Sequence, residues 1–239
     1  MPQIFVPKEI REGETRVAAV PETVQRLTRD GFAVVVEKGA GVASMISDEA
    51  LEKAGATISD DASVSGVADI VLKLHPPTLE EAAQLREGGL LVSHLWPFAN
   101  KALCEKLMER RVTVFAMDQI PRTTRAQYMD ALSSQMNIAG YKAVIMAAER
   151  LPKVVPLMMT AAGTINPAKV VVMGAGVAGL QAIGTAKRLG AAVEATDVRP
   201  EVTGLVGSLG GEVCEAPGMA VGAGGVAAEQ AEEVSGRRW

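Results

Sequence analysis

The sequence predicts an α/β fold with two domains, of which the second is incomplete. Short apolar runs alternate with amphipathic segments over roughly the first half of the chain, which is the pattern of a sheet flanked by helices. A strand, a glycine-rich turn, a helix and a second strand then follow one another over residues 170–197. After residue 197 the sequence supplies only one further weak strand, whereas a complete doubly wound domain contains about six.

Residues 1–125 are predicted to form the first domain. Its strands are expected at residues 4–6, 32–36, 70–74, 90–93 and 112–117. The helices between these strands carry start signals. Pro21 stands in a first helical turn and Ser47 is an N-cap, while Thr78 and Glu81 form a capping box. We therefore expect this domain to fold as an independent α/β unit.

A connecting region, residues 126–168, is predicted to separate the two domains. A long helical pattern covers residues 126–151 and is interrupted only mildly by Gly140. Residues 152–168 then contain three prolines, which indicate a hinge or a crossing between domains. The second domain is expected over residues 169–239.

A glycine motif opens the predicted helix of the second domain. Gly174, Gly176 and Gly179 form a GxGxxG pattern directly after an apolar strand. The first glycine allows a tight turn, the second lets the backbone approach a pyrophosphate, and the third lets the helix pack closely on the strand. The pyrophosphate would lie on the free amides at the helix N-terminus. Val177 and Ala178 belong to the same predicted site. With the α/β pattern of the first domain, this motif predicts two Rossmann-like domains, the second incomplete.

An acidic residue follows the second strand of this unit. Asp197 lies 18 residues after Gly179, close to the spacing at which a carboxylate binds the adenosine ribose hydroxyls. Because this carboxylate would repel a 2′-phosphate, NAD(H) is expected in preference to NADP(H). Arg199 weakens the preference slightly, and Val198 and Arg199 complete the predicted cofactor-binding set. The alternative is that the glycines serve packing alone.

The composition argues against several other classes of protein. Hydrophobic residues make up 48% of the chain and charged residues 22%, which is ordinary for a globular protein. The net charge is -4 and no basic run occurs, which argues against a nucleic-acid partner. The two cysteines form no CxxC and no signal peptide precedes them, which favours a reducing cytosol and buried, inert thiols. No apolar stretch is long enough to span a membrane, and no ligand spacing indicates a metal site.

Four stretches of the chain carry a resemblance to a known family. They are RVAAVPETVQRL near the start, PRTTRAQYMDALSSQMNIAGYKAV, PLMMTAAGTINPAKVVVMGAGVAGLQAIGTAKRLGA and ATDVRP. Together they resemble the soluble NAD(H)-binding domain of the proton-translocating NAD(P) transhydrogenase alpha subunit, whose relatives include the alanine dehydrogenases. The resemblance covers nearly the whole chain up to Arg199 and continues more loosely to residue 234.

The resemblance implies an activity, partners and a location. The family is the Si/Re-specific type of transhydrogenase. Its NAD(H)-binding domain passes hydride from NADH to NADP⁺ bound on a partner subunit, which regenerates NADPH. A membrane domain, here in a separate chain, couples this transfer to proton translocation. The resemblance further implies a homodimer that is cytoplasmic and peripheral to the inner membrane through its partner subunits, without nucleic acid.

The resemblance also assigns residues to the nicotinamide end of the cofactor. Arg122, Gln127, Asp130 and Ser133 match the polar loop that lies over the nicotinamide in the family. Gln127 is the residue expected to face the NADP side. Without the resemblance, the charges at Arg122, Arg125 and Asp130 would be interpreted as a solvated surface cluster.

An alanine-dehydrogenase-like enzyme is one alternative. Oxidising an amine releases a proton with the hydride and requires a general base, whereas transfer between two nicotinamides requires only close and oriented rings. As we align them, alanine dehydrogenases place a lysine and a histidine where this chain has His75 and Trp96. Lys73 and His94 lie two residues away, on the same strand face. Arg16 is either a substrate ligand or part of a structural ion pair.

A truncated, non-catalytic fragment with weak or no NAD binding is the second alternative. Residues 216–227 stand where the family has a mobile loop that closes over the nucleotide, and Val226 replaces an expected tyrosine. The further strands of the family are expected to be missing. Their absence would remove contacts around the nicotinamide ribose and leave a sheet edge exposed.

Overall fold

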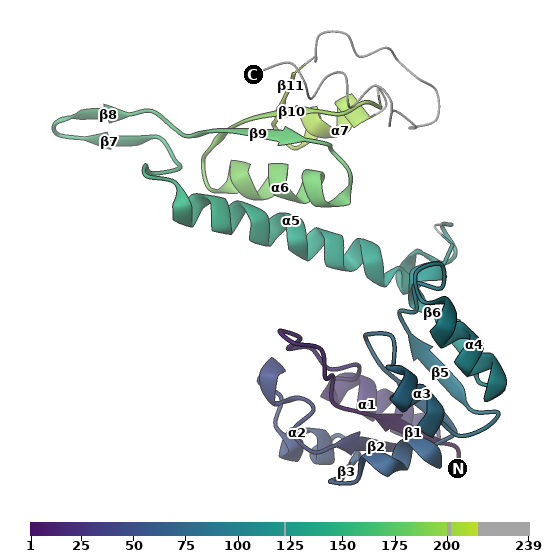
Figure 1. Cartoon of the computed structure of the whole chain (residues 1–239). Coiled ribbons are helices and arrows are strands. Elements are labelled where there is room, and N and C mark those ends of the chain that lie inside the picture. Colours follow the sequence, from purple (N-terminus) through teal and green to yellow (C-terminus); the bar gives the residue numbers. More distant parts are fainter. Residues whose placement is uncertain (122, 200–201, 215–239) are drawn as a thin grey trace. The chain divides into compact units, whose positions relative to one another are not determined.

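The computed structural model describes residues 1–121, 123–199 and 202–214. The chain divides into two compact units, Met1–Ala131 and Leu132–Trp239, and both are α/β structures (Figure 1). Among the described residues, no helix is long and apolar enough to cross a membrane. The division into three regions with boundaries after residues 125 and 168 stays a prediction.

The first unit is built on a parallel sheet of six strands in the order β3-β2-β1-β4-β5-β6. The strands are β1 (Gln3–Val6), β2 (Ala33–Glu37), β3 (Thr57–Ser59), β4 (Ile70–Leu72), β5 (Leu90–Ser93) and β6 (Thr113–Ala116). This is the order of a complete doubly wound nucleotide fold. In such a sheet the crevice lies where the strand order reverses, which is here between β1 and β4.

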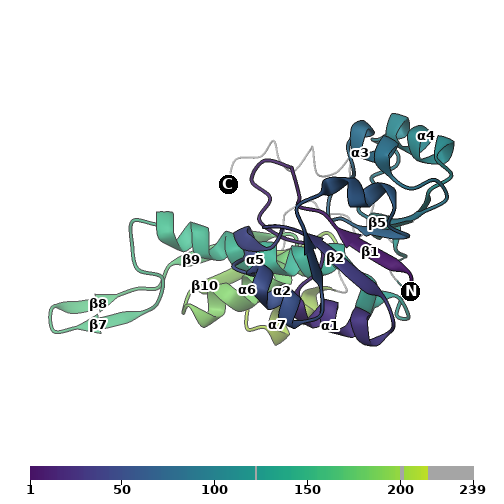
Figure 2. The ribbon, with the colours of Figure 1, turned by 90° about the horizontal axis from the view of Figure 1, so that it is seen from below.

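Helices cover the two faces of this sheet. The helices of the first unit are α1 (Pro21–Arg29), α2 (Asp48–Lys53), α3 (Leu79–Gln84) and α4 (Lys101–Glu109), with shorter 3-10 turns η1 (Val42–Ser44), η2 (Ala62–Gly66) and η3 (Met117–Gln119). α1 and α2 pack on one face, and α3 and α4 on the other (Figure 2). The neighbours Ile4 and Phe5 lie in different cores, because successive strand residues point to opposite faces.

The predicted helix start signals of the first unit are confirmed. Pro21 is the first residue of α1. The Ser47 side chain caps α2 by accepting a hydrogen bond from the Ala50 N–H. Thr78 and Glu81 form the reciprocal capping box of α3. These local signals place three of the four helices because each depends only on neighbouring residues.

Some predictions for the first unit need correction. β3 was not predicted, because it is a short strand at the sheet edge with little apolar alternation, and α4 was not predicted either. The strand expected at residues 70–74 ends at Leu72. Beyond it, the Leu74 N–H donates to the Glu9 carboxylate at 2.6 Å, while the Lys73 N–H and the Leu74 carbonyl still hydrogen-bond to Val92 and His94. Cys104 and Cys214 are free, as expected, but half-buried instead of buried.

The helix predicted over residues 126–151 is wrong at its start. α5 spans Ala131–Arg150, and Gln127–Met129 form a separate 3-10 turn, η4. The two are separated because Asp130 leaves the helical region, with φ -75° and ψ 84°. The residues assigned by resemblance to the nicotinamide end therefore do not lie on one continuous helix.

The proline-rich segment contains an antiparallel hairpin that the sequence did not predict. Its strands are β7 (Met158–Thr160) and β8 (Gly163–Ile165). Gly163 provides the positive φ of +137° at the turn, a value that favours glycine. All residues of both strands are exposed, and the hairpin projects from its own unit in Figures 1 and 2.

The second unit carries a parallel sheet of three strands in the order β11-β10-β9. Its elements are β9 (Lys169–Met173), α6 (Val177–Arg188), β10 (Ala192–Thr196), α7 (Thr203–Ser208) and β11 (Glu212–Val213). Among the described residues, this corresponds to the 3-2-1 half of the doubly wound order. That the domain is incomplete stays a prediction. Residues 200–201 lie outside the described residues, as do residues 216–227.

The core of the second unit joins α5, α6 and the sheet. α6 lies between the sheet and α5 (Figure 1). Val144 of α5 and Ile183 of α6 belong to one buried cluster with Val193 of β10. A side chain at Gly140 would meet the Ala178 carbonyl oxygen at 2.1 Å. Gly140, which the sequence suggested as a mild interruption, therefore marks the place where α5 and α6 pack closely.

Candidate dinucleotide site

The glycine turn has the geometry that its motif predicts. Gly174 follows β9 with a φ of +94°, and its N–H donates to the Thr196 carbonyl of β10 at 2.8 Å. A Cβ at Gly179 would lie 1.9 Å from the Gly174 carbonyl oxygen, so the third position excludes every side chain. No atom lies within 4 Å of a Cβ built at Gly176, the N-cap of α6. The backbone is thus open to an anion at the helix N-terminus.

Asp197 connects the end of β10 to this turn. Its Oδ2 accepts the Ala175 N–H at 2.7 Å. Its Oδ1 accepts the Arg199 backbone N–H at 2.9 Å, and the Arg199 guanidinium donates to both oxygens, from Nε at 2.9 Å and Nη2 at 3.1 Å. The pKa of the Asp197 carboxyl is lowered, chiefly by the Arg199 side chain and despite partial burial. The site therefore holds an ionised carboxylate beside the glycine turn.

The structure brings together the residues predicted for the adenosine end. Val177 is the first residue of α6, Ala178 follows it, and Val198 comes directly after Asp197 on the loop beyond β10. Val177 and Val198 are partly exposed, at 45% and 40%. The sequence did not single out Ala175, because its contribution is a backbone N–H that any residue could provide. Cofactor contacts by these residues stay predictions.

The residues assigned to the nicotinamide end are only partly described. Gln127 is exposed at the start of η4, and Asp130 is half-buried at its end. Ser133 is half-buried in the first turn of α5. Gln127 and Asp130 belong to the first unit and Ser133 to the second, while Arg122 lies outside the described residues. Their role over a nicotinamide stays a prediction.

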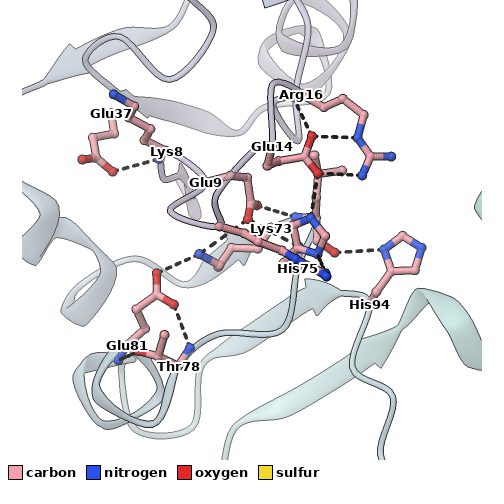
Figure 3. Close-up of polar contacts among 12 residues, drawn as sticks. Lys8, Glu9, Glu14, Arg16, Glu37, Lys73, His75, Thr78, Glu81 and His94 are labelled. Carbon is pink, nitrogen blue, oxygen red and sulfur yellow. Dashed lines mark hydrogen bonds and ion pairs between the residues drawn. The ribbon is translucent and has the colours of Figure 1, made fainter. Parts of the chain in front are cut away.

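A polar cluster at the carboxyl end of β1 and β4 surrounds Glu14 (Figure 3). Arg16 donates to Glu14 Oε1 from Nε at 2.9 Å and to Oε2 from Nη2 at 2.7 Å. His75 Nε2 lies 2.6 Å from the same Oε2. Arg16 is thus part of a structural ion pair, one of the two roles expected for it. No motif marked Glu14, and the only signal was an acid two residues before an arginine.

Lys73 and His94 also have structural partners. Lys73 Nζ is 2.7 Å from Glu81 Oε1 and 3.9 Å from Glu9 Oε2, and its side chain is only 3% exposed. His94 Nδ1 lies 2.9 Å from the Leu74 carbonyl oxygen, and its ring stacks on Trp96. A general base for amine oxidation would have to leave these contacts. In the described part of the chain, no group of three His, Cys, Asp or Glu side chains could hold a metal ion.

The fold and the glycine turn together define the class of this protein. It is an α/β protein whose second unit has the first strands, the glycine turn and the helix of a Rossmann fold of the dinucleotide-binding kind. The family model "Alanine dehydrogenase/PNT, N-terminal domain" matches residues 5–139, and "Alanine dehydrogenase/PNT, C-terminal domain" matches residues 143–235. The chain belongs to the alanine dehydrogenase/PNT family. The resemblance found in the sequence is therefore confirmed.

Individual relatives are similar over most of this chain. An NAD(P) transhydrogenase alpha-subunit chain of Rhodospirillum rubrum is 50% identical over 97% of this chain and 63% of its own length. The crystal structure of transhydrogenase from Sinorhizobium meliloti matches with a TM-score of 0.86 at 48% identity, over 90% of this chain and 64% of that one. An L-alanine dehydrogenase structure matches with a TM-score of 0.78 at 29% identity, over 88% and 60%. The chain thus spans less than two thirds of these relatives.

Proposed function

We propose that this chain is the NAD(H)-binding component of an NAD(P) transhydrogenase, passing hydride from NADH to NADP⁺ held on a partner subunit. The observation that carries the proposal is the Asp197 carboxylate bonded to the Ala175 N–H inside the glycine turn. This arrangement suits an adenosine ribose and a pyrophosphate on α6. The identity of about half the residues to a transhydrogenase subunit supports it.

The proposal extends to partners and location. The enzyme is of the Si/Re-specific, proton-translocating type, with an NADP(H)-binding subunit and a membrane domain in a separate chain. The component itself is cytoplasmic and peripheral to the inner membrane. It forms a homodimer, and the exposed apolar residues of the β7–β8 hairpin are candidates for the contact, because apolar surface of this kind is typical of interfaces. Met159 is 81% exposed there.

In the proposed reaction the protein's main role is to position the two nicotinamide rings. NADH supplies the hydride, and its transfer to NADP⁺ releases no proton, so no general base is needed. The glycine turn and Asp197 would hold the adenosine end, while Arg122, Gln127, Asp130 and Ser133 would orient the nicotinamide end. Orientation of this kind contributes several kcal/mol, up to about 7–11, to lowering a bimolecular barrier. The structural partners of Lys73 and His94 favour this function over amine oxidation.

Coenzyme titration tests the binding step. NADH is expected to bind more tightly than NADPH in a fluorescence titration of the whole chain, because Asp197 repels a 2′-phosphate. Asp197→Asn should narrow the preference by about tenfold, or about 1.4 kcal/mol. Asp60→Asn, an exposed acid of the first unit, is the matched control. Equal affinity of the wild type for both coenzymes would contradict the proposal.

Activity measurements with the same protein separate the alternatives. Hydride transfer should appear only after an NADP-binding transhydrogenase subunit is added. Oxidation of NADH by the chain alone with pyruvate and ammonium would favour the dehydrogenase. An absence of saturable NADH binding would favour the non-catalytic fragment.

A further inference from the structure

His75 lies between an arginine and a glutamate where the strand order of the first sheet reverses. Its Nδ1 is 3.2 Å from Arg11 Nη1, and its Nε2 is 2.6 Å from Glu14 Oε2. Arg11 and Glu14 belong to the loop that follows β1, whereas His75 belongs to the loop that follows β4. Figure 3 shows the ring beside Glu14. The imidazole therefore bridges two loops at the carboxyl edge of neighbouring strands.

The chemistry of the two partners fixes where the ring carries its proton. A guanidinium has five N–H donors and no acceptor, so Nδ1 must accept from Arg11 and is unprotonated. The Glu14 carboxylate is ionised and can only accept, since the pKa of Glu14 lies far below its usual value, chiefly because of the Arg16 side chain. Nε2 must therefore carry the proton, and His75 is neutral in this arrangement.

A further proton taken up by the ring can go only to Nδ1. The new N–H would point at the guanidinium donors, and the imidazolium would repel the positive charge of Arg11. The hydrogen bond from Nε2 to Glu14, in contrast, becomes charge-assisted at both ends. Among the described residues the Arg11 side chain has no other hydrogen bond or ion pair, and its contact with His75 is exposed. Arg11 can therefore leave without breaking another bond.

The charges around the ring balance only while His75 is neutral. In the described part of the chain they are the acids Glu9, Glu14 and Glu81 and the cations Arg11, Arg16 and Lys73. Arg16 and Lys73 are each held by an acid, at 2.7 Å in both pairs. One added proton gives this cluster a net positive charge, and the departure of Arg11 into solvent restores the balance.

We propose that His75 is a proton-operated latch, which in its neutral form holds Arg11 across the crevice between the loops after β1 and β4 and on proton uptake releases it. Imidazole is the side-chain group that normally changes charge between about pH 5 and 8. Arg11 and His75 both line a cavity of about 430 Å³ at this crevice. Release of the guanidinium therefore changes both the width and the charge of its opening. The latch does not depend on a bound nucleotide.

The protonation state can be tested directly because the chain has only two histidines. His94 Nδ1 lies 2.9 Å from the Leu74 carbonyl oxygen, which only accepts, so His94 must carry a proton on Nδ1. At about pH 8 the two neutral rings are thus expected to be opposite tautomers. Nitrogen NMR of the isotope-labelled whole chain distinguishes them, and His75→Gln assigns the signals. A His75 ring with a proton on Nδ1 at this pH would overturn the inference.

The release of Arg11 is measured by carbon relaxation of its side chain in the same protein. The order parameter of Arg11 Cδ should exceed that of Arg29, an exposed arginine in the last turn of α1, at about pH 8, and it should fall to the Arg29 value near pH 5. Arg11→Lys identifies the Arg11 signal by its loss. An Arg11 side chain that is equally ordered at both pH values, or equally mobile at both, would contradict the latch.

His75→Gln is the matched variant. Its amide offers an oxygen to Arg11 and an N–H to Glu14, as the neutral imidazole does, but it does not titrate. In this variant the Arg11 side chain should stay ordered at both pH values. A loss of order on acidification that is the same in wild type and in His75→Gln would show that another group releases Arg11, which also overturns the proposal. Circular dichroism verifies that each variant is folded.

Discussion

At the scale of single residues, Glu14 is a nearly buried carboxylate with several hydrogen-bond donors. Its carboxylate accepts hydrogen bonds from the Thr15 and Arg16 N–H groups as well as from the Arg16 and His75 side chains, and its side chain is 7% exposed. The pKa of Glu14 lies far below its usual value, chiefly because of the Arg16 side chain. Glu14→Gln removes the negative charge, and the NH₂ group of the new side chain would face the N–H groups that now donate to the carboxylate. We expect a loss of about 1–2 kcal/mol of unfolding free energy at pH 7.

The pH dependence of this loss follows from the direction of the pKa shift. Because the pKa is lower in the folded than in the unfolded chain, Glu14 stabilises the fold fully above its unfolded pKa of about 4.3, and the contribution declines as the pH falls below that value. Urea denaturation followed by circular dichroism should show the difference in unfolding free energy between the two proteins shrinking progressively as the pH falls below about 4. Glu12→Gln, an exposed neighbour, is the control. A difference that is constant with pH would contradict the assignment.

At the scale of elements, the packing of α5 on α6 depends on Gly140. Its missing side chain lets the α5 backbone approach the Ala178 carbonyl oxygen. Gly140→Ala should destabilise the second unit by about 1–3 kcal/mol, because the two helices must move apart. Gly184→Ala in α6 is the matched control, since its Cβ would meet only the flexible end of Arg188 at 3.4 Å. It should be neutral or stabilising by up to about 1 kcal/mol. Equal thermal unfolding of the two variants would refute the packing argument.

At the scale of the whole molecule, the proposed homodimer can be tested through the β7–β8 hairpin. Met159→Asp places a charge on an 81% exposed apolar residue, and burying that charge in an interface is unfavourable. Sedimentation velocity should show dimer dissociation at a protein concentration at least about tenfold higher than for wild type. Met45→Asp, at a 96% exposed site in the first unit, should sediment like wild type. A hairpin variant that dimerises normally would remove the hairpin from the interface.

Much of the fold could be predicted because its signals are local. The caps at Ser47 and Thr78 act over three residues, and the glycine turn needs only a positive φ at Gly174 and no side chain at Gly179. Apolar runs likewise predicted β1 and β2, whose residues are mostly buried, whereas Val171 and Met173 of the equally apolar β9 are exposed. The α5 start was misplaced because one residue, Asp130, leaves the helical region within a sequence of good helix formers.

The sequence by itself determined the α/β class, the glycine turn and the acid that follows the second strand of the nucleotide unit, since these depend on residue type and short spacing. Only the tertiary structure decided what that acid contacts. Ala175 and Asp197 are 22 residues apart, and Glu14 and His75 are 61 apart, so no local pattern records either contact. Hydrogen bonds between distant segments arise when parallel strands bring their carboxyl ends to one edge of a sheet, and that arrangement exists only in the folded chain.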